Sequence, residues 1–261
     1  MASTESGLPA SIEAAWGRRE RPSKGPRPSL SLERVVAAAV AVADAEGLDA
    51  VSMSRVAAEL GASTMALYRY VAAKDELLML MADAALGPPP PPPAGEKGWR
   101  AGLSRWAWAA REAYRRHEWG LRIPISGPPV APNQITWLED GLRSLRSTRL
   151  SEQEKLSSIL VLSGFVRNAA TLAADIAAAH TADEQTMRSF GALLQRFTDA
   201  EHFPALHAAI ADGAFDDDDD IDAEFVFGLE RVLDGIGALV SRSAGAAGRR
   251  SRDARRAPRS R

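Results

Sequence analysis

One short segment constrains the fold of this chain more than any other. It runs from residue 52 to residue 70 and reads SMSRVAAELGASTMALYRY. Ser52 and Ser63 can each cap a helix, because a serine side chain accepts a hydrogen bond from an early backbone N–H. Apolar residues recur at helical spacing after Ser52, and Gly61 follows them, where a left-handed helix end favours glycine. The segment therefore predicts a helix-turn-helix, the motif that places its second helix in the major groove of DNA.

The flanking sequence favours a DNA-binding head over ordinary helix packing. Upstream, an apolar stripe that begins after Ser31 and stops at Gly47 predicts a supporting helix. Downstream, Lys74 opens a further helix that leads out of the head. A basic arm interleaved with prolines precedes the head, and its charges suit phosphates or a narrow minor groove. Its basic residues are Arg18, Arg19, Arg21, Lys24 and Arg27.

Several motifs in the right order resemble the TetR family of transcriptional repressors. In the head they are SLER at 31–34, EGLD at 46–49, SMSRVAAELG at 52–61, LYRYV at 67–71 and KDEL at 74–77. The C-terminal part resembles the tetracycline-repressor-like class in RHEW at 116–119, GPP at 127–129, PN at 132–133, WLE at 137–139 and FVFGLERVLDG at 225–235. The resemblance implies a homodimeric repressor of a palindromic double-stranded DNA operator, released when a small-molecule effector binds.

Composition bounds the class of protein. The chain has 261 residues, of which 46% are hydrophobic and 25% are charged, as in a soluble globular protein. It contains no cysteine, so disulfide and thiol chemistry are excluded. We find no apolar run near the roughly 18 residues that span a bilayer and no signal-peptide pattern. We therefore expect a cytoplasmic protein without a membrane partner.

The fold class predicted from these patterns is all-α, since no segment shows strand alternation. We expect a disordered basic arm at 1–29, a helix-turn-helix domain at 30–78, a helical ligand-binding and dimerisation domain at 79–242, and a disordered basic tail at 243–261. Prolines at 88–93 predict an extended, stiff spacer. After the head, helices are predicted at 74–85, 99–117, 133–145, 151–179, 183–197, 202–211 and 222–240.

The start of the second helix in the motif is expected to meet base edges. Thr64 can donate or accept a hydrogen bond there, while Met65 or Ala66 can contact a thymine methyl group. Arg69 can reach a guanine or a phosphate. The predicted DNA-binding residues are Arg27, Ser52, Arg55, Ser63, Thr64, Met65, Ala66, Tyr68, Arg69, Tyr70 and Lys74.

Phosphate contacts are expected from two tyrosines and a lysine. Tyr68 and Tyr70 offer hydroxyl groups, and Lys74 stands at a helix N-terminus whose N–H groups and dipole favour an anion. The family resemblance supports Tyr68 and Lys74, and the alternative for Tyr68 is a core aromatic. Relatives carry arginine where this chain has Ser54, and the adjacent Arg55 points elsewhere around the helix.

Aromatic residues gather early in the body and suit a mostly apolar ligand oriented by a few polar groups. The predicted ligand-binding residues are Trp106, Tyr114, His117, Asn133, Trp137, Arg167 and Asn168. Core packing is the alternative for each aromatic residue, and a structural role for each polar one. Pro124 and Pro128 stand where the tetracycline repressor has its magnesium-linked histidine and an arginine. We therefore expect no magnesium–tetracycline recognition, no metal and no cofactor.

The long helix that begins after Ser151 and the last helix from Asp222 are the candidates for dimerisation. The resemblance favours a four-helix interface between two chains. The residues predicted there are Leu162, Val166, Phe225, Leu229, Val232, Leu233 and Ile236, with burial in the chain's own core as the alternative.

We expect no catalytic residue. His202 and His207 lie five residues apart, not the three or four that place two ligands on one helix face, and no nucleophile elbow or phosphate loop is present. The acidic run at 216–220 can bind a cation or form a solvated loop. Two other functions remain open: a carrier or enzyme in which the head only packs, and an architectural DNA-binding protein without a ligand.

Overall fold

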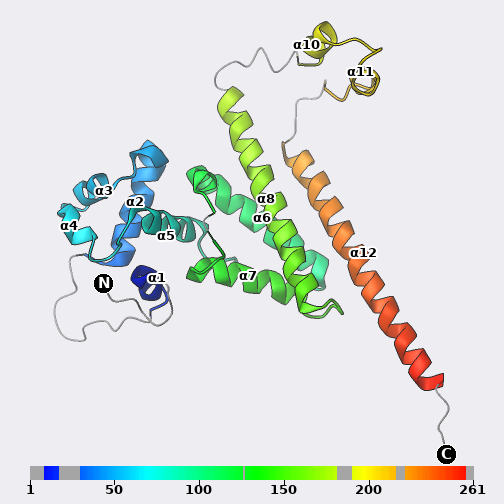
Figure 1. Cartoon of the computed structure of the whole chain (residues 1–261), viewed down its shortest axis with the longest axis horizontal. Coiled ribbons are helices and arrows are strands. Elements are labelled where there is room, and N and C mark those ends of the chain that lie inside the picture. Colours follow the sequence, from blue (N-terminus) through cyan, green and yellow to red (C-terminus); the bar gives the residue numbers. More distant parts are fainter. Residues whose placement is uncertain (1–8, 18–29, 126, 181–189, 216–220, 257–261) are drawn as a thin grey trace, which may run out of the picture.

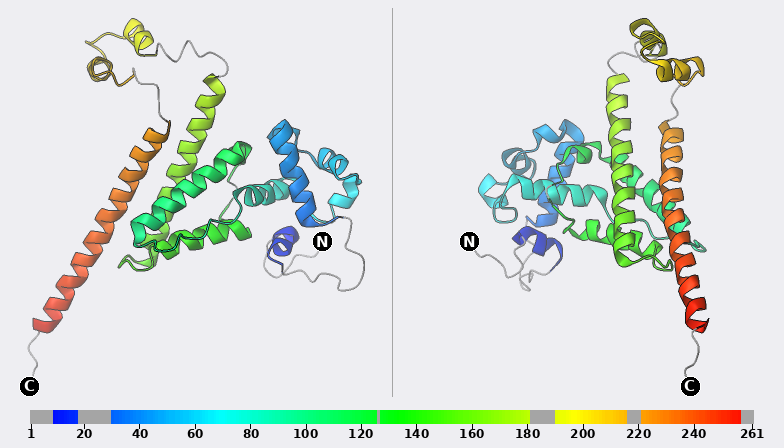
Figure 2. Two further views of the ribbon diagram at one scale, coloured as in Figure 1. Left: turned by 180° about the vertical axis from the view of Figure 1, so that it is seen from behind. Right: turned by 45° about the vertical axis from the view of Figure 1, so that its right-hand side comes forward.

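The computed structural model describes residues 9–17, 30–125, 127–180, 190–215 and 221–256, and every regular element among them is helical (Figure 1). A head at one end joins a body of longer helices, and α8 and α12 form its far side (Figure 2). In chain order the elements are α1 (Ala10–Ala15), α2 (Leu32–Glu46), η1 (Leu48–Ala50), α3 (Met53–Glu59), α4 (Thr64–Leu67), α5 (Lys74–Leu86), α6 (Trp99–Arg116), η2 (Glu118–Arg122), α7 (Pro132–Ser144), α8 (Glu152–His180), α10 (Phe190–Phe197), α11 (Pro204–Ala211) and α12 (Ile221–Arg256).

Local capping starts and stops the helices of the head. The Ser31, Ser52 and Ser63 side chains accept hydrogen bonds from the backbone N–H three residues on, at the starts of α2, α3 and α4. Gly47 after α2 and Gly61 in the turn after α3 have φ of 85° and 60°, a backbone region that strains residues with a Cβ. The predicted helix-turn-helix is therefore present, and apolar side chains from α2, α3, α4 and α5 form its core.

Helix α5 carries the chain from the head into the body. It ends at Gly87, whose carbonyl accepts a hydrogen bond from Trp137 Nε1 at 2.8 Å. The carboxylate of Asp83 caps the start of α7, accepting from the backbone N–H of Gln134 at 2.9 Å and of Asn133 at 3.3 Å. Burial raises the pKa of Asp83, while these hydrogen bonds act to lower it.

The body packs α6, α7, α8 and α12 around one apolar core. The rings of Trp106 and Trp137 meet edge to face at 5.5 Å between centroids, and Trp106 Nε1 donates to the Trp137 carbonyl at 2.9 Å. Helices α6 and α7 approach closely at Gly102, where an added Cβ would lie 2.9 Å from the Cβ of Ser144. A side chain at Gly102 would therefore push these helices apart.

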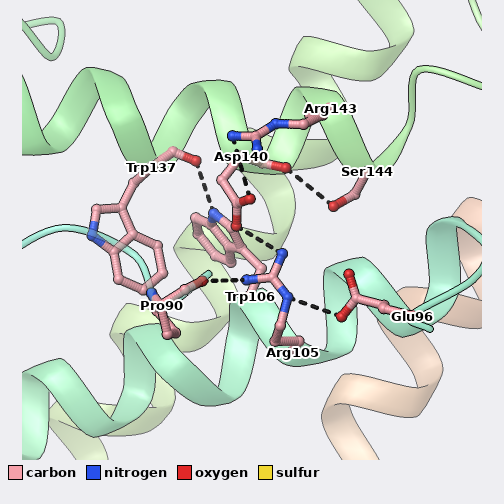
Figure 3. Close-up of polar contacts among 8 residues, drawn as sticks. All are labelled: Pro90, Glu96, Arg105, Trp106, Trp137, Asp140, Arg143 and Ser144. Carbon is pink, nitrogen blue, oxygen red and sulfur yellow. Dashed lines mark hydrogen bonds and ion pairs between the residues drawn. The ribbon is translucent and has the colours of Figure 1, made fainter. Parts of the chain in front are cut away.

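An arginine on α6 ties the proline-rich segment to the body (Figure 3). The guanidinium of Arg105 donates to Glu96 and to Asp140, each at 2.9 Å, and to the carbonyl of Pro90 at 3.3 Å. Asp140 is buried and also lies 3.6 Å from Arg143. The segment expected to be a stiff spacer has no regular secondary structure, and Arg105 fixes it to the body through Pro90 and Glu96.

Two segments expected to be disordered contain helix. Within 1–29, Ala10–Ala15 form α1 because Ile12 is fully buried against the head. At the other end, α12 continues to Arg256, well past the predicted end at residue 240, because the next proline is Pro258. The predicted start of a helix at 183 lies outside the described residues, as does the acidic run at 216–220.

Helix α8 leaves much apolar surface uncovered. Residues Glu152–Ala178 are long and apolar enough to cross a membrane by length and composition, with a mean hydropathy of 1.4. The expectation that no such run exists was wrong by that criterion. Core helices of soluble proteins pass the same test, but only 22% of the apolar window is buried in this chain. Most of this part of α8 is therefore exposed in the single chain.

Candidate functional site: a helix-turn-helix surface and a body cavity

Helices α3 and α4 lie at the outer edge of the head, on the side away from the body (Figure 2). On α4 the side chain of Met65 is 74% exposed, while Thr64 and Ala66 are half-buried beside it. Tyr68 and Arg69 follow and are both exposed, whereas Leu67 is fully buried in the head core. An apolar tip, a hydroxyl and a cation thus stand together on one protruding edge.

The start of α5 adds a second exposed feature. Lys74 is exposed in its first turn, and the preceding residue, Ala73, caps the helix without a side-chain hydrogen bond. The carboxylate of Glu76 is instead turned back and accepts from the backbone N–H of Ala72 at 2.5 Å. A lysine beside a helix N-terminus is an arrangement that attracts phosphate.

Other residues predicted to bind DNA have partners within the head. Arg55 forms ion pairs with Glu46 at 2.6 Å and with Glu59 at 2.9 Å, and its hydrogen bond lowers the pKa of Glu46. The hydroxyl of Tyr70 donates to the carbonyl of Leu30 at 2.8 Å. Ser52 and Ser63 serve as helix caps, and Arg27 lies outside the described residues. Glu59 lies four residues after Arg55 on α3, a spacing that the sequence shows, whereas Glu46 and Leu30 come from other parts of the head.

A mostly apolar cavity of about 570 Å³ opens in the body. Helices α5, α6, α7 and α8 and the loop before α7 line it. Five of the seven residues predicted to bind ligand are in its wall: Trp106, Tyr114, His117, Trp137 and Arg167. Such a volume and lining are typical of small-molecule sites.

The two asparagines that were predicted to bind ligand lie outside the cavity wall. The Nδ2 atom of Asn133 donates to Asp83 at the α5–α7 contact, and Asn168 is exposed and is not part of the wall. The neighbouring Gln134 lines the cavity instead, together with Ser163. Ser163 lies four residues before Arg167 on α8, so helical spacing from that arginine is the signal that could have identified it.

Arg167 shapes the wall rather than standing free in it. Its Nη2 atom donates to the carbonyls of Leu121 at 2.8 Å and Ile123 at 3.0 Å, and its guanidinium lies 6.0 Å from the Tyr114 ring centroid. Arg167 therefore fixes the segment that follows α6 against α8. The polar groups at the cavity are few, and most of the wall is aliphatic, with the rings of Trp106, Tyr114 and Trp137 among it.

His117 joins the cavity to the head. Its Nδ1 atom lies 2.8 Å from Oδ1 of Asp44, in the last turn of α2. Trp119 Nε1 donates to the same oxygen at 2.6 Å. Because α5 also lines the cavity, through Ala82, Ala85 and Leu86, the head contacts the cavity wall along two routes.

The residues predicted at a dimer interface lie in the core of their own chain. Buried there are Leu162, Val166, Phe225, Leu229, Leu233 and Ile236, and Val232 is partly buried against them. These side chains fill the contact between α8, α12 and α6. Among the residues whose side chains the structure describes, the large apolar side chains of α8 and α12 that are exposed are Leu156, Leu160, Val161, Leu172, Val226 and Phe227.

Comparison with known proteins agrees with both parts of the chain. The family model for bacterial regulatory proteins of the tetR family matches residues 35–80, and that for the tetracyclin repressor-like C-terminal domain matches residues 91–240. The chain is 40% identical over 239 residues to the HTH-type transcriptional repressor DrrR1 of Streptomyces coeruleorubidus, covering 90% of this chain and 87% of that protein.

Solved structures of one relative share the fold. The TetR family protein ActR of Streptomyces coelicolor, in complex with actinorhodin, has a TM-score of 0.68 and 30% identity over 82% of this chain and 98% of that one. Apo ActR has a TM-score of 0.66 and 30% identity over 85% of this chain and 100% of its own.

Proposed function

Because the chain belongs to the TetR family and is a helix-turn-helix transcriptional repressor, we propose that it is a homodimer released from its operator by a small aromatic effector. The observation that carries this proposal is the cavity of about 570 Å³, whose wall includes both α5 and His117. A molecule in that cavity touches groups that also hold the head. Binding in the body can therefore alter DNA affinity, which is a coupling between two distinct sites.

The DNA-reading surface that we propose is smaller than the set suggested by sequence. Thr64, Met65 and Arg69 face base edges, with the Met65 side chain suited to a thymine methyl group. Tyr68 and Lys74 contact phosphates, which fix the head on the duplex without reading sequence. Arg55 and Tyr70 support this surface through their partners in the head.

A second copy of the chain is the proposed cover for the exposed faces of α8 and α12. Val161 on α8 is 60% exposed and Phe227 on α12 is 61% exposed, so two helices that contact each other both carry exposed apolar side chains. Burying these side chains removes apolar area from water. A two-fold dimer also presents two heads to half-sites about 34 Å apart, or multiples of that, which suits a palindromic operator.

The proposed effector is a polycyclic aromatic molecule with few polar groups. The relative ActR has been crystallised with actinorhodin and with (S)-DNPA, and Trp106, Trp137 and Tyr114 offer aromatic walls here. Pro128 in the same wall has no donor or metal-binding group, so we propose no recognition of magnesium–tetracycline. We place this regulator in the cytoplasm, where its DNA is.

DNA binding by the purified protein tests the proposal directly. Fluorescence anisotropy with a duplex from DNA flanking its own gene should show tight binding, and a scrambled duplex of equal length should bind more weakly. Actinorhodin should weaken binding to the first duplex. Equal affinity for both duplexes would contradict sequence-specific repression. A carrier would be favoured if the full chain bound neither duplex and a variant without the head still bound the cavity ligand.

Two substitutions distinguish the residue proposed to position the head on phosphates from the residue proposed to read base edges. Lys74→Ala should weaken binding to all duplexes alike and reduce the salt slope by about one, because it removes one phosphate contact. Thr64→Val should change the preference among base variants of the operator instead. The proposed division of roles is wrong if both variants lose affinity uniformly.

A further inference from the structure

Helix α1 lies outside both segments that match the family models, which begin at residues 35 and 91. It packs beneath α2 and α5, beside the start of α7 (Figure 1). Ile12 is fully buried in the head core, and Ser11 is 2% exposed. A six-residue helix is too short to be stable alone, so these contacts hold it in place.

On the head side, α1 supports the start of α5. The hydroxyl of Ser11 donates to Oε1 of the buried Glu76. The other oxygen of Glu76 accepts from the backbone N–H of Ala72. Glu76 lies two residues after Lys74, so this pair of hydrogen bonds braces the turn that carries the proposed phosphate contact.

On the body side, Trp16, the residue that follows α1, reaches the loop that supplies part of the cavity wall. The indole Nε1 of Trp16 donates to the carbonyl of Val130 at 2.8 Å. Val130 directly follows Gly127, Pro128 and Pro129, which line the cavity, and its side chain packs against the head core. One short helix therefore contacts the head through Ser11 and Ile12 and the body through Trp16.

We propose that α1 is a strap that holds the DNA-binding head in one orientation on the body, with Trp16 and Ser11 as its positioning residues. This inference rests on the proposed function, because orientation matters for a dimer that must fit two half-sites. The contacts of Asp44 and Asp83 also join head and body. The strap therefore narrows the range of head orientations, and it is not the sole contact between head and body.

The size of the effect follows from the Trp16 hydrogen bond. A typical intramolecular hydrogen bond shifts an equilibrium on the order of two- to tenfold. Trp16→Phe removes the N–H donor and keeps an aromatic ring. The population of molecules in which the head has left its held orientation on the body should therefore rise by that factor. Affinity for a two-site operator should fall only in proportion to the loss of the held orientation, because that orientation alone is competent to bind.

Because the chain contains no cysteine, a spin label reacts only with a cysteine that is introduced by substitution. Such a label can therefore measure head orientation without signal from other sites. A nitroxide on Ala58→Cys, an exposed position of α3, reports the head-to-head distance in the dimer by pulsed electron resonance. Hydrogen exchange at the amides of Ala72, which donates to Glu76, and of Leu77, which donates to the carbonyl of Ala73, reports opening at the start of α5. Trp108→Phe is the matched control, since Trp108 is 37% exposed, close to the 42% of Trp16, and lies on α6 in the body.

Trp16→Phe should broaden the head-to-head distances and speed exchange at the start of α5 on the order of two- to tenfold, with exchange in α8 unchanged. Ser11→Ala should speed exchange at the same amides. Trp108→Phe should change neither readout. Unchanged exchange at α5 in Trp16→Phe and Ser11→Ala, or equal acceleration in α8, would overturn the strap.

A wild-type sample without dipolar signal would be monomeric, and that result would contradict the proposed dimer. The strap would still be decided by hydrogen exchange, which needs one chain only.

Discussion

The Nδ1 atom of His117, a residue in the cavity wall, lies 2.8 Å from Oδ1 of Asp44 in the last turn of α2. Trp119 donates to the same oxygen. A single carboxylate of the head thus holds two side chains of the segment that leaves α6. This is one side-chain route from the cavity to the helix that supports the helix-turn-helix.

Asp44→Ala should uncouple the two sites. The variant should bind actinorhodin as wild type does, because Asp44 is not in the cavity wall. The ratio of operator affinities without and with actinorhodin should fall on the order of tenfold towards one, since a charged acceptor of two hydrogen bonds is lost. Calorimetry gives the first quantity and anisotropy the second.

Asp49→Ala is the matched control, because Asp49 is another exposed aspartate in the head. It should keep the wild-type ratio. An Asp44→Ala protein whose operator binding still responds fully to actinorhodin would show that coupling runs along α5 alone.

Phe227→Asp should disrupt the proposed dimer. Phe227 is 61% exposed on α12 in the single chain, and a carboxylate at that point would be buried between two copies, with Arg231, which lies over the Phe227 ring, as its neighbouring cation. Sedimentation velocity should show a monomer at concentrations where wild type is dimeric. Met65→Asp places the same charge on a 74% exposed apolar residue of the head and should leave the dimer intact. A dimeric Phe227→Asp protein would move the interface to another face.

Gly102→Ala should destabilise the body. Its new Cβ would lie 2.9 Å from the Cβ of Ser144, an atom that cannot swing away without moving α7. We expect the free energy of unfolding to fall by about 1–2 kcal/mol. Overpacking costs about 1–3 kcal/mol, and the higher helix propensity of alanine regains up to about 1 kcal/mol. Gly245→Ala, with open space around it on α12, should be neutral or stabilising. Urea unfolding of both variants decides the matter, and equal stability of the two would refute the close approach.

The buried carboxyl of Asp83 should make stability depend on pH. Burial raises its pKa above the ordinary value of 3.8, so the folded state holds the proton more tightly than the unfolded chain does. Its contribution to stability is therefore greatest at acid pH and falls as pH rises from about 3.8 through the raised pKa, staying level above it. The difference in unfolding free energy between wild type and Asp83→Asn should follow that curve in urea titrations. A difference that grows with rising pH would mean that the hydrogen bonds from Asn133 and Gln134 outweigh burial.

The amino-acid sequence by itself determined the local structure of the head. Ser31, Ser52 and Ser63 each cap a helix through an N–H three residues away, and Gly61 permits the turn. In each cap the serine and the N–H that it binds lie within one helical turn, so both can be identified from the sequence alone. The aromatic residues of the cavity were also predictable, because Trp106 and Tyr114 share one stripe of α6 with His117 nearby.

Only the tertiary structure decided which partners and faces are used. Both sides of α8 and α12 carry apolar residues, and packing against α6 buries the face with Leu162 and Phe225 while leaving Leu160 and Phe227 exposed. Arg55, a suitable phosphate contact by type, is held by Glu46 nine residues earlier. Helix α1 forms because a pocket in the head accepts Ile12. Each of these outcomes depends on side chains from different elements that the fold brings together, and spacing along the sequence does not say which of several possible contacts forms.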